Sequence, residues 1–236
     1  MTKEDVIATA KSQAREEARA AAAKPLTVYR VFWLFLIAGF GGDLIEVAFW
    51  LITRGELISR SSLVYGPFSL VWGLAAVLLT LALHGMDDQS AAQIVLAGTV
   101  LGGLYEYICS WVQEVLFGAC FWDYRHLPLN IHGRVNLVFC LFWGLAALVW
   151  VRLVYPALCV FIDRVPRQRG RKAVRAAALF LACSTVLSAA ALYRMDQRRE
   201  GVPASGAVTR FLDETYPDSA LKARYPNMGI LDEIGW

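Results

Sequence analysis

Charged residues are scarce in this chain, and neither sign of charge dominates. Asp, Glu, Lys and Arg together make up 18% of the 236 residues, and the formal net charge at pH 7 is +3. So small a charge does not favour binding to nucleic acid, and no Lys/Arg-rich stretch alternates with aromatic side chains that could stack on bases. We therefore expect no nucleic-acid partner.

The chain also lacks the short motifs of several enzyme classes. It contains no G-x-S-x-G, no H-E-x-x-H and no G-x-x-x-x-G-K-[ST], so it cannot hydrolyse ATP with a phosphate-binding loop of its own. Its three histidines, His84, His126 and His132, match no zinc-ligand spacing. We expect neither a metal nor a cofactor, and we favour a function without catalysis.

A disulfide framework is absent as well. The five cysteines are an odd number, none belongs to a C-x-x-C pair, and all lie in apolar stretches. We interpret them as small apolar packing residues.

Apolar residues, in contrast, are abundant and continuous. Hydrophobic residues make up 57% of the chain, which also has eight tryptophans, a residue common at membrane interfaces. Five apolar runs cover residues 28–52, 63–84, 91–117, 135–161 and 176–193. At about 1.5 Å per helical residue, the first four can cross roughly 30 Å of hydrocarbon, and the fifth is just long enough. The pattern predicts an all-α, polytopic integral membrane helix bundle with about five transmembrane helices.

Two polar segments flank this predicted transmembrane domain of residues 28–193. Residues 1–27 are charged and Ala-rich, which predicts a helix that ends before Pro25. Residues 194–236 are polar and contain three prolines, which predicts a loosely ordered tail with one short helix near residues 208–214.

Basic residues indicate the orientation in the cell membrane. Six lie in or beside the N-terminal segment and six in the fourth connection, residues 163–175, and five spans place both groups on one side. Because basic residues favour the cytoplasmic side, we expect a cytoplasmic N-terminus. Arg194, Arg198 and Arg199 follow the fifth run and count against this arrangement. Either the tail is outside despite them, or the fifth segment does not cross.

Ionisable residues inside the apolar runs predict a polar site between helices, because such residues are costly in a membrane. Glu106, Ser110 and Glu114 are spaced by four in the third run and share one helix face. Asp43 and Glu46 lie one turn apart in the first run, directly after two glycines that allow close helix approach.

Two further segments are expected to close this site from the outer side. Arg60 and Tyr65 lie in a hydroxyl-rich stretch that continues to Gly66 and Pro67 and predicts an irregular entry into the second helix. Asp123, Asn130 and Arg134 belong to the polar, aromatic third connection, residues 121–134. We predict a cleft between the first three spans, roofed by the third connection and open outward.

Most of these residues also have a simpler interpretation. A carboxylate and an arginine can form a buried ion pair that only joins two helices. Tyr65 can be an interfacial anchor. The number of carboxylates on two helices favours a binding site over this alternative.

The predicted function is the binding and passage of a small polar or charged solute. Glu46, Glu106 and Glu114 would coordinate a cationic group, and Arg60 and Arg134 would orient them or bind an anionic group. One alternative is a membrane enzyme that acts at the outer face on a lipid-linked or envelope substrate, with Glu106 or Asp123 as acid or base. Another is a non-catalytic assembly or sensor subunit.

A set of short motifs resembles the CmpB family of ABC-transporter permeases over residues 31–162. The motifs are Gly42-Asp-Leu-Ile-Glu46, Tyr65-Gly-Pro67, Glu106-Tyr-Ile-Cys-Ser110, Glu114 followed by Phe117-Gly118, Trp122-Asp-Tyr124 and Asn130-Ile-His-Gly-Arg134. The resemblance implies a transporter permease whose ATP-binding subunit is a separate chain.

Overall fold

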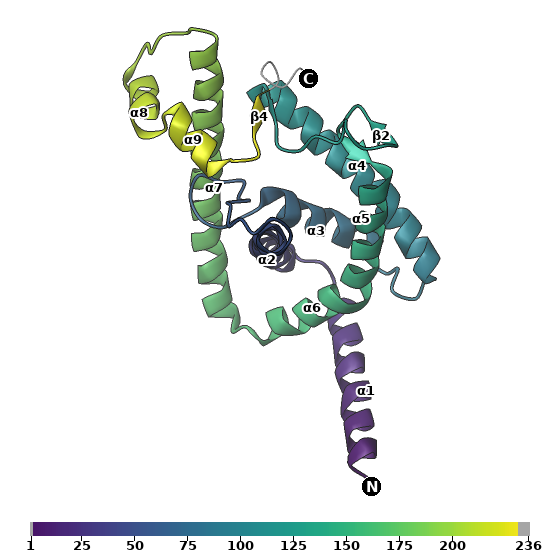
Figure 1. Ribbon diagram of the computed structural model, residues 1–236. Coiled ribbons are helices and arrows are strands. Elements are labelled where there is room, and N and C mark those ends of the chain that lie inside the picture. Colours follow the sequence, from purple (N-terminus) through teal and green to yellow (C-terminus); the bar gives the residue numbers. More distant parts are fainter. Residues whose placement is uncertain (1, 231–236) are drawn as a thin grey trace.

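The computed structural model describes residues 2–230 and is mainly helical in that range (Figure 1). The elements, in chain order, are α1 (Lys3–Ala22), α2 (Val28–Arg54), α3 (Leu70–Leu83), α4 (Ala91–Phe117), β1 (Ala119–Cys120), β2 (Asn130–Ile131), β3 (Val135–Asn136), α5 (Leu137–Val149), the π-helical turn η1 (Trp150–Val154), α6 (Tyr155–Arg164), α7 (Arg167–Arg199), α8 (Ala207–Thr215), α9 (Asp218–Arg224) and β4 (Gly229–Ile230).

Four helices in the described part of the chain are long and apolar enough to cross a membrane. They are α2, α4, α7 and the continuous helix Leu137–Arg164, which consists of α5, η1 and α6. Local chemistry sets several of their ends. Thr27 and Ser90 cap the first turns of α2 and α4, and Gly55 and Gly118 end the same helices in the left-handed conformation, which glycine adopts without strain. The predicted all-α bundle is confirmed.

The second apolar run forms a shorter helix than predicted. Only α3, 14 residues, is helical, because Gly66 (φ 81°) and Pro67 interrupt the run. At about 1.5 Å per residue, α3 is roughly 21 Å long, too short to cross alone. The Ser69 N–H donates to Gly39 O (3.0 Å), so α3 begins beside the middle of α2. Because α2 is long enough to span a membrane, we infer that the irregular segment 55–69 supplies the other half of this crossing.

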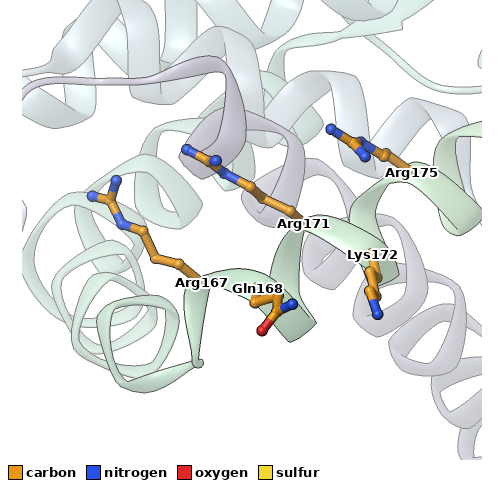
Figure 2. Close-up of a pocket in the computed structure, with 5 residues that line it drawn as sticks. All are labelled: Arg167, Gln168, Arg171, Lys172 and Arg175. Atoms are coloured by element: carbon orange, nitrogen blue, oxygen red, sulfur yellow. The ribbon is translucent and has the colours of Figure 1, made fainter.

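The fifth crossing is longer than predicted, and the fourth connection is shorter. Only Val165 and Pro166 separate α6 from α7, so the basic residues from Arg167 onward form the first turns of a helix and not a loop. Figure 2 shows several of them projecting from these turns. Helix α7 begins where Gly170 contacts Tyr29 and ends where Gly118 contacts its last turn. It therefore runs from the side of the protein that holds α1, the α1 side, to the opposite side, the tail side.

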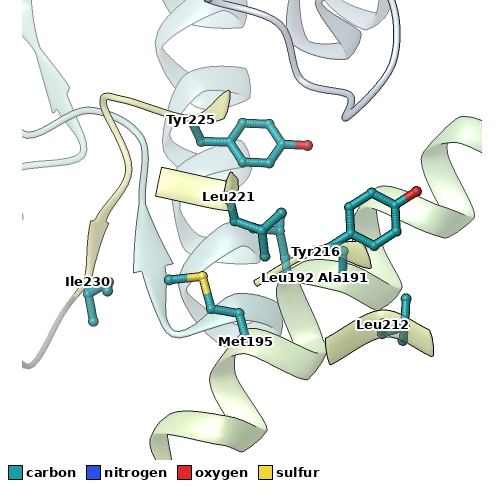
Figure 3. Close-up of a cluster of buried hydrophobic side chains, with 8 residues drawn as sticks. All are labelled: Ala191, Leu192, Met195, Leu212, Tyr216, Leu221, Tyr225 and Ile230. Atoms are coloured by element: carbon teal, nitrogen blue, oxygen red, sulfur yellow. The ribbon is translucent and has the colours of Figure 1, made fainter. Parts of the chain in front are cut away.

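The tail is more ordered than its prolines suggested. Helices α8 and α9 pack on the last turns of α7, and β4 pairs with β1 in an antiparallel register (Figure 1). Their contact is a cluster of buried apolar side chains, drawn in Figure 3: Ala191, Leu192, Met195, Leu212, Tyr216, Leu221, Tyr225 and Ile230. The last six residues of the predicted tail lie outside the described range.

Ion pairs explain why arginines follow the fifth crossing on the tail side. Arg194, 3% exposed, donates from Nε and Nη2 to the two carboxylate oxygens of Asp213 (both 2.9 Å). Arg198 donates to Asp213 (2.6 Å) and Asp218 (2.7 Å). Hydrogen bonds from Arg194 and Arg198 lower the pKa of Asp213 from 3.8 to about 2. Arg194 and Arg198 are thus neutralised by carboxylates of the tail. Their positive charge therefore does not count against the side of the membrane predicted for the tail.

Glycines allow the closest helix contacts. Gly42 of α2 lies against the Trp72 ring of α3, and Gly102 of α4 lies against Trp143 of α5. Gly41, one residue before Gly42, has nothing within 4 Å of the place a β-carbon would take.

Replacing Gly42 by Ala should lower stability by about 1–3 kcal/mol, because the added methyl group would displace Trp72. Gly41→Ala is the matched control and should be neutral or stabilising, because Ala is the better helix former. Thermal unfolding of the two variants in detergent measures the difference. Equal melting temperatures would show that α2 and α3 do not pack as described.

The Asp213 pairs predict how the tail responds to acid. Because the folded-state pKa is lowered, the stabilisation is complete above pH 3.8 and is lost as the pH falls through about 2. The tail should stay packed at pH 4, whereas Asp213→Asn should release α8 even at pH 7. Hydrogen exchange of residues 207–224 measures both effects, and Glu214→Gln, an exposed neighbour, should leave exchange unchanged.

Candidate functional site

A cavity of about 210 Å³, lined by both apolar and polar side chains, lies on the tail side, between the irregular segment 55–69 and helices α2, α4 and α7. Five separate parts of the chain line it. They contribute Glu46; Ser59, Arg60, Ser61, Ser62, Leu63, Ser69, Leu70 and Val71; Gln113, Phe117, Phe121 and Trp122; Thr185, Ser188, Ala189 and Leu192; and Tyr225, Pro226 and Asn227. The first turn of α3 therefore faces the cavity.

An ion pair forms one wall. The Arg60 Nε donates to Glu46 Oε2 (2.8 Å), and the Trp72 indole donates to Glu46 Oε1 (2.6 Å). The Arg60 guanidinium also lies over the Trp50 ring, 5.5 Å from its centroid. Both carboxylate oxygens of Glu46 are thus engaged, and Arg60 is held by contacts on two sides.

Side-chain hydroxyls satisfy much of the irregular backbone beside this wall. The Ser61 hydroxyl donates to Gly66 O (2.8 Å) and accepts from the N–H groups of Leu63 and Phe68 (both 3.2 Å). The Ser188 hydroxyl of α7 accepts from the Val64 N–H (2.9 Å). Such partners are required here, because irregular backbone at membrane depth needs hydrogen bonds from the protein itself.

The tail supplies the remaining partners through Arg224, the last residue of α9. Its guanidinium donates to Leu63 O (2.8 Å), Gly66 O (2.7 Å) and the Ser59 hydroxyl (3.1 Å). The following residues, Tyr225 to Asn227, cover the cavity. No role is predicted for this segment from its sequence. One arginine in a polar, proline-containing tail looks like any solvated residue, so no signal distinguished it.

Two buried polar atoms on the cavity wall have no hydrogen-bond partner in the described structure. They are Gln113 Oε1 of α4 and Asn227 Nδ2 of the tail. One needs a donor and the other an acceptor. Leaving such groups unpaired costs about 1–3 kcal/mol each, so the cavity is suited to a polar occupant.

A second polar group lies outside the cavity, where α4 meets the third connection. The Tyr124 hydroxyl donates to Glu106 Oε1 (2.7 Å), and its ring stacks on Phe139 at 4.7 Å. Burial raises the pKa of Tyr124, so it remains a protonated donor. Glu114 pairs with Arg134, which is buried. These contacts join α4 to the third connection, as in the simpler interpretation of the carboxylates.

The other predicted residues are dispersed. Asp43 is buried in α2, and its Oδ1 lacks a described hydrogen-bond partner, as does the Ser110 hydroxyl of α4. Tyr65 bonds to the Tyr216 hydroxyl of the tail (2.9 Å). Asp123 binds Arg125, whose hydrogen bonds lower the pKa of Asp123.

Asn130 acts within its own turn, where its side chain bonds to Leu127 O and the Gly133 N–H. Of the ten predicted residues, the structure therefore places Glu46 and Arg60 on the cavity wall and the other eight elsewhere.

Replacing Arg224 by Gln should loosen the irregular segment, because two carbonyl groups and a serine lose a charged donor. We expect a loss of local stability of about 3 kcal/mol, seen as faster hydrogen exchange in residues 55–69. Arg210→Gln, on the exposed face of α8, is the matched control. Unchanged exchange in the Arg224 variant would contradict the role assigned to this arginine.

Comparison with known proteins identifies the family to which the chain belongs. No curated protein and no solved structure matches the chain. The family model described as "Putative ABC-transporter type IV" (CmpB) matches residues 33–189, which include most of α2, all of α3 to α6, most of α7, and the cavity walls except Leu192 and the tail. This match covers more than half of the chain, which is therefore a multi-pass membrane protein that belongs to the CmpB family.

Proposed function

We propose that the chain is a permease subunit that binds a small polar or charged solute in the tail-side cavity. The observation that carries this proposal is a pair of buried atoms without a described hydrogen-bond partner, Gln113 Oε1 of α4 and Asn227 Nδ2 of the tail, in two side chains that line the cavity. A solute that offers both a donor and an acceptor would satisfy them. Serine hydroxyls and the Glu46–Arg60 pair add further polar contacts.

The cavity limits the solute by size and charge. Its volume of about 210 Å³ lies below the usual range for drug-sized ligands, which favours a small molecule. The first turn of α3 and Arg60 favour a negatively charged or electron-rich group on the solute. Glu106 and Glu114 lie outside the cavity, so we assign them to helix packing and not to direct solute binding.

A separate ATP-binding subunit would drive the transport. The family is an ABC-transporter family, and this sequence has no phosphate-binding loop. We place that subunit on the α1 side, which would be cytoplasmic because it holds most of the basic residues. Native mass spectrometry of gently purified protein should then detect an associated ATP-hydrolysing chain.

The outer-face enzyme is less well supported than the permease. Glu46 is the one carboxylate among the described residues that line the cavity, and Arg60 and Trp72 bind both of its oxygens. A general base needs a free oxygen near the reacting atom. Conversion of an envelope substrate by the purified chain alone would restore the enzyme alternative, and a stable complex without solute binding would favour an assembly subunit.

Gln113→Leu tests the cavity directly. It should leave stability equal or raised without solute, because an unsatisfied buried amide is removed, yet it should weaken solute binding about tenfold, equivalent to about 1.4 kcal/mol. Thermal shifts with a panel of amino acids, amines and small organic acids measure both effects. Gln13→Leu, on exposed α1, is the control.

Glu46→Gln supplies a second test in the same panel. It removes the carboxylate that neutralises Arg60, so it should increase the thermal shift caused by anionic compounds, whereas Glu56→Gln, an exposed neighbour of the pair, should leave that shift unchanged. If no compound shifts the wild-type protein, or if Gln113→Leu binds normally, the cavity is not the solute site.

A further inference from the structure

A second concave surface lies at the opposite end of the protein, on the first turns of α7. It encloses about 460 Å³ and is lined by Arg167, Gln168, Arg171, Lys172 and Arg175, which we call the basic pocket. Residues 167, 171 and 175 are spaced by four and share one helix face. Figure 2 shows these three arginines extending to the same side of α7, whereas Lys172 points away from them.

The positive charge of the basic pocket is not neutralised by the described residues. The carboxylates on the α1 side that form ion pairs are bound to other cations: Asp163 to Lys24 and Arg30, Glu17 to Arg164, and Asp87 and Asp88 to Arg19. Like charges one helical turn apart repel each other. A bound anion would remove this repulsion.

An exposed apolar stripe continues from the basic pocket along the same face of α7. Leu179, Cys183 and Val186 follow Arg175 at helical spacings of four, four and three, and all three are exposed. Leu179 and Val186 are 68% and 69% exposed. The face thus changes from cationic to apolar within one turn, at the point where the apolar run of α7 begins.

We propose that the basic pocket binds the headgroup of an anionic phospholipid from the α1-side leaflet, with its acyl chains along the stripe of Leu179, Cys183 and Val186. The planar guanidinium groups bind phosphate oxygens through paired hydrogen bonds. A zwitterionic headgroup also carries a positive charge, which the cationic side chains of the pocket repel. Clusters of basic residues next to a membrane span attract anionic lipids for the same reason. The apolar stripe favours a lipid over free phosphate, which would make no use of it.

The test is lipid retention by the full-length protein in native mass spectrometry, with phosphatidylglycerol and phosphatidylcholine of identical chains at equal concentration. The wild-type protein should retain phosphatidylglycerol about tenfold better. The triple variant Arg171→Gln/Lys172→Gln/Arg175→Gln should lose this preference. The triple variant Lys3→Gln/Lys11→Gln/Arg15→Gln, which removes the same charge from α1, should keep it.

Three results would overturn the proposal: equal retention of both lipids by the wild type, an unchanged preference in the α7 variant, or an equal loss in the α1 variant. Inorganic phosphate at millimolar concentration tests whether the ligand of the basic pocket is a lipid or free phosphate. Displacement of the lipid by phosphate alone would show an anion site in which the apolar stripe has no role. If the α7 triple variant does not fold, the single variant Arg175→Gln replaces it and should show a partial loss of preference.

Discussion

The structure depends on how the irregular half of one membrane crossing satisfies its backbone. Segment 55–69 descends from the tail side to mid-depth without helical hydrogen bonds, and in a membrane such a chain is stable only when protein groups bond to it. The Arg224 guanidinium does so for Leu63 O and Gly66 O, and the Ser61 and Ser188 hydroxyls bond to neighbouring groups. Without these side chains the crossing would leave polar groups unpaired in an apolar environment.

This requirement connects parts of the chain that seem independent in sequence. Arg224 can reach the segment only if α9 packs on α7, which in turn needs the buried apolar cluster and the Asp213 ion pairs. The same packing places Tyr225 to Asn227 over the cavity. The tail therefore both completes a membrane crossing and closes the site. Any change that releases the tail should alter the cavity as well.

The sequence predicted the helices better than it predicted the site. The run at residues 91–117 matches α4, because its apolar length, Ser90 cap and Gly118 end are local features. Residues 63–84 were predicted as a span with an irregular entry around Gly66 and Pro67, but hydropathy does not show that this irregular part extends to Ser69 and leaves a helix too short to cross alone. The stripe of Glu106, Ser110 and Glu114 was correctly recognised as facing protein. Hydrophobic pattern cannot tell which neighbour a helix face meets, and here it meets the third connection and not the cavity.

What the sequence alone determined is the class of protein. Long apolar runs must enter a membrane, because exposing them to water is costly, and their polar residues must face other parts of the protein, because exposing those to hydrocarbon is costly. The tertiary structure alone decided which polar groups meet. Glu46 pairs with Arg60 across a chain reversal, and Arg224 reaches a loop more than 150 residues earlier. Such pairings depend on how helices pack and on where a tail returns, and neither is encoded in the spacing of residues within one segment.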